Sequence, residues 1–236
     1  MSLFSRLDFE AGTPGDCLDI TMRILAFTDI HGAYERVETI LSREDFDAMI
    51  IGGDLTTQGT VREASEAIRS FQSFGKPLFV VAGNMDLPAF DALYEDLGVN
   101  INGKGAALGD AGIFGIAGSP FTPMHTPYEI SEAEIERRAE SGWRDVQNLR
   151  RTIFVPHAPP HGTKLDRIHI GTHVGSKAVR EFVDRHQPDV LVCGHIHEAR
   201  GTDQLGKTVL ANCGPANKGF YASILLGNDI RIELCG

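Results

Sequence analysis

Five apolar segments of this 236-residue chain each end on residues whose side chains bind metals. Each segment has the length and the aliphatic or aromatic content of a buried strand. The residues at the five ends are Asp29 with His31, Asp54, Asn84, His157, and His195 with His197. In open α/β sheets, functional sites form at the carboxyl ends of the strands. The chain is therefore predicted to build a sheet that gathers these side chains at one edge.

Strands and helices are predicted to alternate along most of the chain. The strands are expected over 23–28, 48–52, 78–83, 152–155 and 189–193, and the helices over 34–41, 61–74, 88–97, 131–149 and 176–186. Two short strands joined by a Gly-containing turn are expected over 107–120, and a β-meander over 208–213, 221–227 and 230–234. This alternation indicates an α/β sheet with parallel crossovers. We predict one domain over residues 1–236, with residues 1–21 as an N-terminal lead-in.

Three helix starts carry recognisable capping residues. Asp86 is predicted to N-cap a helix that has Pro88 in its first turn. Ser131 and Glu134 have the spacing of a capping box. Ser176 is expected to cap the helix that follows it, either as an ordinary loop-to-helix junction, which we favour, or with its amide end facing an anionic ligand.

The formal net charge of −10 limits the partners of the chain. A general nucleic-acid-binding surface needs a basic face, so nucleic acid is not an expected partner. A phosphate-containing substrate is still compatible with this charge, because two divalent cations would reverse the local field at a site made of carboxylates and imidazoles.

The four cysteines, Cys17, Cys193, Cys213 and Cys235, form no CxxC pair and no disulfide framework. A reducing cytoplasm is therefore the expected location. The first residues contain no apolar stretch of signal-peptide length, and no window approaches the ~20 apolar residues of a membrane span. We expect a soluble cytoplasmic protein without a membrane partner.

The residues at the strand ends offer carboxylate and amide oxygens and imidazole nitrogens, but no thiolate. Because residues two apart share one face of a strand, Asp29 with His31 and His195 with His197 are expected to project together. Taken alone, each short motif has an ordinary explanation as a turn, a helix cap or a pair of surface histidines. Taken together and in order, they indicate a shared site for Mn²⁺, Fe²⁺/³⁺, Zn²⁺ or Co²⁺ rather than a structural zinc site.

The motifs DIH (29–31), GGDL (52–55), GNMD (83–86), His157 after an apolar strand and GHIH (194–197) resemble the motif series of the calcineurin-like metallophosphoesterases. The resemblance extends over residues 23–216. The segments VPHAPPHGTKLD, HVGSKAV and CGHIHEARG further resemble the small bacterial and archaeal predicted phosphodiesterases of that superfamily. The fold that this resemblance implies is a four-layer α/β/β/α sandwich, in which two mixed β-sheets are flanked by helices.

The resemblance also implies a role for each residue of the series. Asp29, His31 and His197 would hold one divalent metal, Asn84, His157 and His195 would hold the other, and Asp54 would bridge the two. Asn84 would thus act in catalysis as well as in metal binding. Two such metals, with manganese favoured, would lower the pKa of a shared water, whose hydroxide attacks phosphorus in line with the leaving oxygen. The expected substrate is a small phosphoester, with phosphodiesters preferred.

One position departs from the family pattern. Many relatives carry a histidine in the GNH motif, where this chain has Met85, and a thioether has no proton to donate. The usual general acid is therefore missing. The candidates for a replacement acid are His161, His169 and His173, in the loop over 157–175. Each of them can also be explained as a surface or packing residue. We rank His161 first as a catalytic residue, because it is nearest in sequence to a predicted ligand.

Other functions are also compatible with these motifs. A phosphomonoesterase or nucleotide phosphatase needs the same metal site. A non-catalytic scaffold is the alternative from a different class, since the retromer scaffold subunit uses this fold for protein contacts. A site that no longer catalyses a reaction would, however, be expected to lose metal ligands, and all seven positions are intact here. A nuclease is disfavoured by the acidic charge and by the lack of an accessory domain. The turn over Asn212–Pro215 is expected to border the site without a direct catalytic role.

Overall fold

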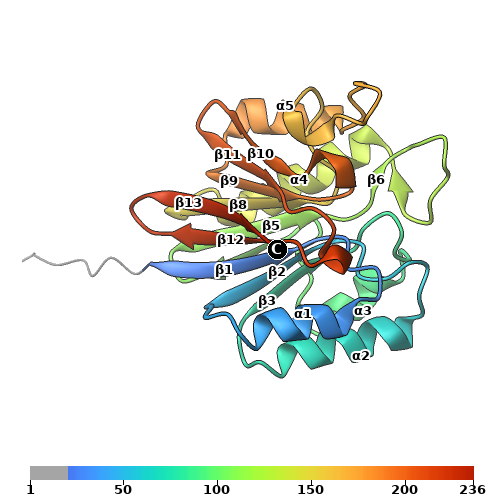
Figure 1. Ribbon diagram of the computed structural model, residues 1–236. Helices are drawn as coiled ribbons and strands as arrows, with labels where there is room; N and C mark the ends of the chain where they lie inside the picture. Colours follow the sequence, from blue (N-terminus) through green and yellow to red (C-terminus); the bar gives the residue numbers. More distant parts are fainter. Residues whose placement is uncertain (1–20) are drawn as a thin grey trace, which may run out of the picture.

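Residues 21–236 are described by a computed structural model, so that all but one residue of the predicted lead-in lies outside the described part of the chain. Two β-sheets pack face to face, and helices cover the outer face of each (Figure 1). Both sheets contain parallel and antiparallel pairs. The predicted α/β/β/α sandwich of two mixed sheets is confirmed.

The first sheet has the strand order β13-β12-β1-β2-β3. Its central strands β1 (Met22–Phe27), β2 (Ala48–Gly52) and β3 (Leu78–Val81) are parallel, and β12 (Tyr221–Leu226) and β13 (Ile230–Cys235) extend it as an antiparallel hairpin. The helices that follow the parallel strands are α1 (Tyr34–Leu41), α2 (Val61–Gln72) and α3 (Phe90–Asp96), and they lie on the same outer side (Figure 1).

The second sheet has the strand order β10-β11-β9-β8-β5-β4. Its strands are β4 (Gly105–Leu108), β5 (Ala111–Ile116), β8 (Arg151–Pro156), β9 (Val190–Cys193), β10 (Gly201–Leu205) and β11 (Thr208–Asn212). The helices α4 (Glu132–Val146) and α5 (Lys177–His186) cover it. A small pair of strands, β6 (Ser119–Pro120) and β7 (Glu129–Ile130), follows β5, and the short 3₁₀ turns are η1 (Lys164–Asp166), η2 (His197–Ala199) and η3 (Ala216–Lys218).

The predicted C-terminal β-meander is wrong. Strand β11 lies in the second sheet, where it pairs in parallel with β9 and antiparallel with β10, a strand that the sequence did not indicate. The chain then crosses to the first sheet, where β12 pairs with β1. Hydrophobic alternation marks a strand but carries no information about which strand it pairs with, so it does not distinguish a meander from strands divided between two sheets.

Two of the helix-start predictions also need correction. Helix α3 begins at Phe90 with Ala89 at its N-cap position, so Asp86 lies outside the helix and does not cap it. Ser131 does cap α4 by accepting from the Glu134 N–H. The Glu134 carboxylate, however, binds the guanidinium groups of Arg137 and Arg138, so the reciprocal half of a capping box is not seen.

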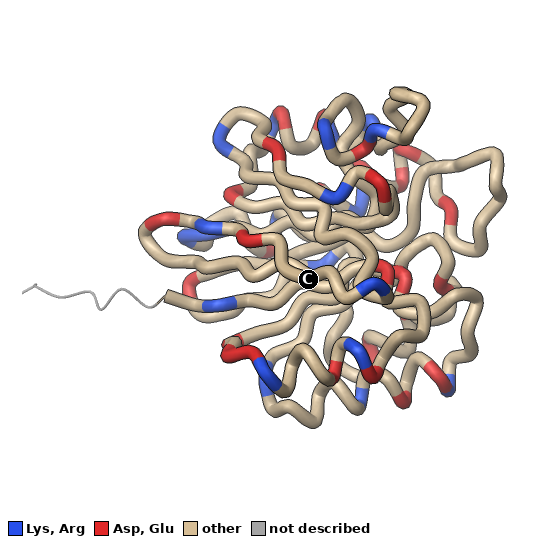
Figure 2. Tube along the Cα trace, in the orientation of Figure 1, with Lys and Arg blue, Asp and Glu red and all other residues tan. Residues whose placement is uncertain are grey.

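The inner strands β5, β8 and β9 of the second sheet are buried on both faces. Along β8, Ile153 and Val155 belong to the hydrophobic cluster that joins the two sheets, whereas Phe154 belongs to the cluster under α4 and α5. Phe154 stacks on Phe114 with ring centroids 4.7 Å apart, and Phe182 of α5 completes the group. Charged residues accordingly occur mainly on helices, turns and outer strands, while the inner strands are nearly free of them (Figure 2).

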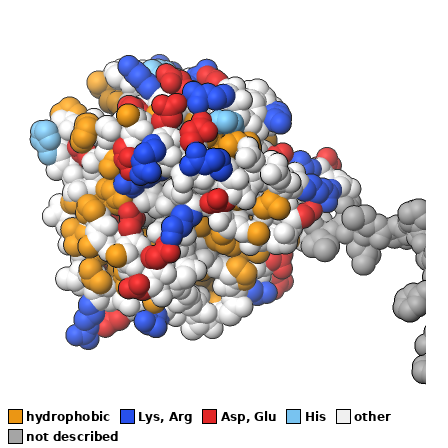
Figure 3. Space-filling model, turned by 180° about the vertical axis from the view of Figure 1, so that it is seen from behind, with side chains coloured by type: hydrophobic (Ala, Val, Ile, Leu, Met, Phe, Trp, Pro, Cys, Tyr) orange, Lys and Arg blue, Asp and Glu red, His pale blue; other side chains and the backbone are white. Residues whose placement is uncertain are grey.

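Seen from behind, side chains of both charges are interspersed with hydrophobic ones over the surface (Figure 3). Cys193, Cys213 and Cys235 are free thiols. Within residues 21–236, no helix combines the length and apolar character needed to cross a lipid bilayer.

We predict that Phe154→Ala lowers the free energy of unfolding by about 3–5 kcal/mol, because it leaves a cavity in a fully packed aromatic cluster. Urea denaturation measures the change. Phe121→Ala is the matched control, since Phe121 is 70% exposed and its truncation should change stability by less than about 0.5 kcal/mol. Equal losses in the two variants would contradict this account of the core.

Candidate metal centre

The predicted ligands lie in the loops that follow the strands, and the backbone turns sharply at several of them. Asp29, His31, Asp54 and His195 have φ angles of 54°, 46°, 50° and 66°. Asp and His enter this left-handed region more readily than most residues, and such conformations cluster at functional sites. The expectation that residues two apart share a strand face is therefore wrong here. The side chains converge because the backbone leaves the extended conformation.

Backbone hydrogen bonds hold the loop after β1 against the loop after β2. The amides of Asp29, His31 and Gly32 donate to the carbonyls of Gly53, Asp54 and Leu55 at 3.0, 2.9 and 3.0 Å. On the other side, Ala216 N–H donates to the Thr28 carbonyl at 2.9 Å. These backbone hydrogen bonds fix the positions of the loops after β1 and β2 without any contribution from side chains.

Asp29, His31 and His197 form a first group, whose ligand atoms all lie within 4.8 Å of one another. Nε2 of His197 is 3.1 Å from Oδ1 of Asp29, and the rings of His31 and His197 are 5.5 Å apart. Asp29 is fully buried, whereas the His31 and His197 side chains are 14% and 37% exposed. This group therefore opens to solvent on its histidine side.

Asn84, His157 and His195 form a second group. Oδ1 of Asn84 is 3.0 Å from Nε2 of His157 and 2.7 Å from Nδ1 of His195. Asp54 lies between the groups: its Oδ2 is 3.7 Å from Nε2 of His31, and its Oδ1 is 3.5 Å from Nε2 of His157. The two oxygens of one carboxylate thus face different sets of nitrogen ligands.

The donor atoms fit divalent cations. Atoms that bind one ion at about 2.1 Å lie about 3 Å from each other, and the contacts between the donors of the two groups span 2.7–3.7 Å. Nδ1 of His31 is 2.9 Å from the Thr57 hydroxyl, and Nδ1 of His157 is 2.8 Å from the Gly52 carbonyl. These bonds orient both rings with Nε2 toward the site, as is usual for metal-binding histidines.

The titration of the cluster reflects its buried charges. Burial alone would raise the pKa of Asp29, but the hydrogen bond from His197 and the charges of His157 and His197 hold it well below its usual range. Burial would lower the pKa of His157, but the charge of Asp54 and its hydrogen bond raise it to about 9. Burial and the charge of His157 lower the pKa of His195 to about 4. A cation that binds near Asp54 at neutral pH must therefore displace a proton from His157.

Asp86 holds two ligand loops together. The prediction that it caps a helix is wrong. Its carboxylate is fully buried and accepts from the amides of Leu55 (3.1 Å), Thr56 (2.8 Å) and Gly83 (2.9 Å), and from the Thr56 hydroxyl (2.9 Å). Burial, followed by the charge of Asp54, raises its pKa to about 6. The preceding Met85 donates its N–H to Oδ1 of Asp54 at 2.8 Å. The only sequence signal for this role was an acidic residue two positions after a ligand.

Asn212 supports the loop that carries His195 and His197. Its side-chain amide donates to the carbonyls of Gly194 (3.3 Å) and Ile196 (2.9 Å), and its oxygen accepts from Gly214 N–H (2.9 Å). The expected site-bordering turn over Asn212–Pro215 is confirmed.

The candidate acids of the loop over 157–175 are not brought to the cluster. The ring of His161 packs against His173 at 6.0 Å, and Nδ1 of His173 pairs with Asp166 at 2.7 Å. Within the described residues, no hydrogen bond, ion pair or ring contact links His161, His169 or His173 to a predicted ligand.

Ser176 caps α5, and the amide end of that helix is filled from within the chain. Its hydroxyl accepts from Val179 N–H, as expected for a cap. The carboxylate of Glu132 accepts from Lys177 N–H and Ala178 N–H, both at 3.0 Å. The favoured interpretation as an ordinary junction is confirmed.

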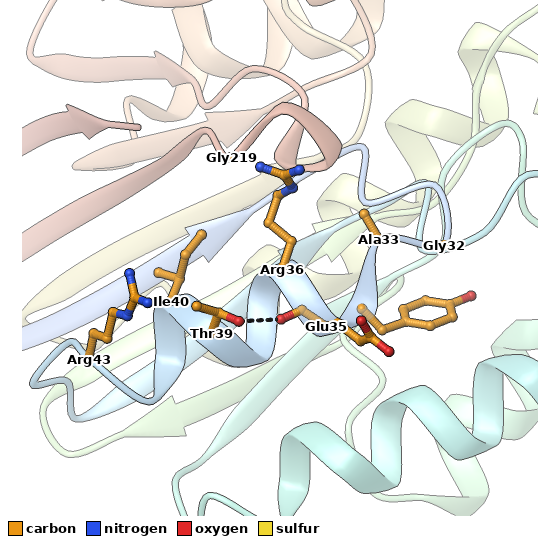
Figure 4. Close-up of a pocket in the computed structure, with 9 residues that line it drawn as sticks. Gly32, Ala33, Glu35, Arg36, Thr39, Ile40, Arg43 and Gly219 are labelled. Atoms are coloured by element: carbon orange, nitrogen blue, oxygen red, sulfur yellow. Dashed lines mark hydrogen bonds between the residues drawn. The ribbon is translucent and has the colours of Figure 1, made fainter.

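Two clefts border the cluster. One, of about 690 Å³, runs along α1 from Gly32 to Arg43, and Arg36 reaches from the helix toward Gly219 across it (Figure 4). The other, of about 580 Å³, includes the candidate ligands Asn84 and His195 in its wall. The second cleft is better placed to receive a substrate, because none of the predicted ligands lines the first.

Known proteins resemble this chain in sequence and in structure. An uncharacterized protein of Methanocaldococcus jannaschii is 31% identical over 205 residues, which cover 85% of this chain and 91% of that protein. A UPF0046 protein of Caenorhabditis elegans is 29% identical over 217 residues, covering 84% and 71% of the two chains.

Among solved structures, TT1561 of Thermus thermophilus superposes with a TM-score of 0.69 at 19% identity, covering 90% of this chain and 98% of that one. A putative 5′-nucleotidase of Staphylococcus aureus superposes with a TM-score of 0.58 at 13% identity, covering 91% and 53%. At these identities the superpositions show the fold alone. The sequence model of the calcineurin-like phosphoesterases matches residues 22–199, which contain all the predicted ligands. The chain belongs to the calcineurin-like phosphoesterase family.

Proposed function

We propose that this chain is a dinuclear metal-dependent phosphoesterase that prefers phosphodiesters. The observation that carries the proposal is the position of Asp54, whose two carboxylate oxygens face different groups of nitrogen ligands. A bridging carboxylate of this kind is what a pair of ions about 3.5–4 Å apart requires. The family membership supports hydrolysis of phosphoesters as the reaction class.

Divalent cations held there would neutralise phosphoryl oxygens and supply a nucleophile from water. Asp29 and Asp54 contribute the negative charge, and the buried imidazole of His157 is held by the Gly52 carbonyl. His31, His195 and His197 form the more accessible side of the cluster. The substrate phosphate is therefore expected to approach from the histidine side, next to the cleft at Asn84 and His195.

The preference for diesters rests on the surroundings of the cluster. Met85 offers no proton to a leaving oxygen. Among residues 21–236, no Lys or Arg lines the cleft at Asn84 and His195 to balance the second negative charge of a monoester. A phosphomonoesterase is the second candidate, and the ratio of turnover with bis-p-nitrophenyl phosphate to that with p-nitrophenyl phosphate in Mn²⁺ separates the two. A scaffold protein would bind no metal.

The central test is removal of the bridging carboxylate. We predict that Asp54→Ala loses bound metal and lowers phosphoester hydrolysis by more than about 100-fold, since even residues that only orient metal ligands are worth 10–100-fold. Metal content is measured by elemental analysis and activity with bis-p-nitrophenyl phosphate. Asp184→Ala, which removes a surface carboxylate paired with Arg180, is the matched control and should match the unmodified chain. Retained activity in Asp54→Ala would rule out the dinuclear mechanism.

The missing acid predicts a steep dependence on the leaving group. General acid catalysis is typically worth about 10²–10⁴-fold, and its loss matters most for alkoxide leaving groups. We expect alkyl phosphoesters to be hydrolysed far more slowly than nitrophenyl esters, with log kcat falling steeply as the pKa of the leaving group rises. Comparable rates for both classes would show that another residue donates the proton, and His161→Ala would then test whether it is that histidine.

The role of Asp86 in holding two ligand loops together gives a further prediction. Asn and Asp serve almost equally as helix N-caps, so a cap would tolerate Asp86→Asn. Both oxygens of Asp86 accept from N–H groups, however, and an amide NH₂ in place of either would face a donor. We expect Asp86→Asn to lower the unfolding free energy by about 1–3 kcal/mol and the metal affinity by about 10–100-fold.

Urea denaturation and metal titration measure these two effects. Asp96→Asn, at an exposed position at the end of α3, is the matched control and should change neither quantity. An Asp86→Asn variant with unchanged stability and metal affinity would show that this carboxylate does not hold the ligand loops in place.

A further inference from the structure

The cleft of about 580 Å³ beside the candidate metal centre is lined by two candidate ligands and by mostly apolar residues of two other segments. Asn84, His195 and Ile196 line its inner side. Its outer side is formed by the segment over 121–126, between β6 and β7, and by the segment over 168–174, between η1 and α5. The lining residues from these segments are Phe121, Thr122, Pro123, Met124, Thr126, Ile168 and Val174.

Exposed hydrophobic side chains concentrate in these two segments. Within the described residues, the large hydrophobic side chains that stand exposed are Val61, Phe121, Met124, Ile170 and Val174. All except Val61 belong to the two segments, with Phe121 70% and Met124 81% exposed. Scattered apolar residues on a surface need no explanation, but a cluster of them beside a candidate site marks a binding surface.

The segment over 121–126 is held in place by one carboxylate. Glu129 accepts from the hydroxyl and the amide of Thr122 at 2.6 and 3.2 Å, and from those of Thr126 at 2.8 and 2.9 Å. Tyr128 N–H donates to the carbonyl of Asn84 at 3.0 Å, which ties the same loop to a candidate ligand. The exposed positions of Phe121 and Met124 therefore belong to a loop whose conformation is determined by these bonds.

A second carboxylate holds the segment over 168–174. Asp166 is fully buried and accepts from Nδ1 of His173 at 2.7 Å and from Gly175 N–H at 3.0 Å. Val174 N–H donates to its carbonyl at 3.1 Å, and Ile168 N–H donates to Thr172 O at 3.0 Å. Hydrogen bonds thus determine the conformation of both outer walls, which present apolar side chains next to the polar ligand cluster.

The polar groups of the cleft are largely engaged already. The hydroxyls of Thr122 and Thr126 both donate to Glu129. In the described part of the chain, His195 is the one residue lining the cleft that can carry a charge. A sugar or a polar head group would find few free partners there, and burying unpaired polar groups is costly. An apolar group would bury the surfaces of Phe121, Met124 and Val174 instead.

We propose that the organic group of the phosphoester substrate is apolar, an aromatic ring or a branched alkyl chain, and that it lies in this cleft between the segments over 121–126 and 168–174. The inference rests on the proposed function, which places the phosphate at the adjacent metal centre. The volume of the cleft suits a group of the size of a small drug fragment.

The test is equilibrium binding of phosphonates, which share the charged head but resist hydrolysis. Isothermal titration of the Mn²⁺-loaded full chain compares methyl-, butyl- and phenylphosphonate. Each methylene that is buried should tighten binding about fourfold, so butyl- and phenylphosphonate should bind well over tenfold more tightly than methylphosphonate. Phe121→Ser and Met124→Ser should each remove much of this gain while leaving the affinity for methylphosphonate unchanged.

Val61→Ser is the matched control, because Val61 is an exposed hydrophobic residue at the start of α2, outside the cleft, and its loss should change none of the three affinities. Equal affinities for the three phosphonates, in a chain that binds Mn²⁺ and hydrolyses phosphoesters, would overturn this inference and leave the proposed function standing. A chain that binds neither Mn²⁺ nor any phosphonate would overturn both. A dimer in sedimentation velocity that Phe121→Ser and Met124→Ser dissociate would assign the apolar surface to self-association, and would also overturn the inference.

Discussion

The carboxylate of Asp54 is the constraint on which the candidate centre depends. For its two oxygens to face opposite groups of ligands, its backbone adopts a φ of 50° and Met85 N–H fixes one oxygen. The neighbouring Gly83 is constrained in turn, because a Cβ there would lie 2.0 Å from Oδ1 of Asp54. The glycine of the GNMD motif is therefore explained by the close approach of the Asp54 carboxylate to its backbone. This part of the motif follows from the position of that carboxylate.

The candidate centre also joins the two sheets. Asp29, Asp54 and Asn84 follow strands of the first sheet, whereas His157 and His195 follow strands of the second. The buried carboxylates of Asp54 and Asp29 lie beside the imidazole rings of His157 and His197. A cation that binds the folded chain and not the unfolded one adds its binding free energy to stability. Metal binding and the packing of the two sheets are thus coupled through the same loops.

The sequence predicted the layers and a set of candidate ligands, which stays a prediction, but it did not predict the contacts that position these residues. Ligands were recognisable because each follows an apolar strand, a local signal. Asp86 and Asn212 act through hydrogen bonds to loops far away in sequence, and nothing local distinguishes a carboxylate that holds loops from one that caps a helix. The placement of β11 failed for the same reason, since strand pairing is a tertiary property. The assignment of the whole chain to one domain stays a prediction.

The two proposals assign catalysis and substrate selection to different parts of this fold. The candidate ligands lie on loops fixed by backbone bonds to the central strands, and they set the reaction class that the family shares. The walls of the cleft belong to two outer segments, each fixed by its own carboxylate, Glu129 or Asp166. Within the described residues, neither carboxylate contacts a candidate ligand, so the apolar residues of these segments can change with little effect on Asp54. The backbone amide of Met85 donates to the Asp54 carboxylate, while its thioether side chain has no proton to donate.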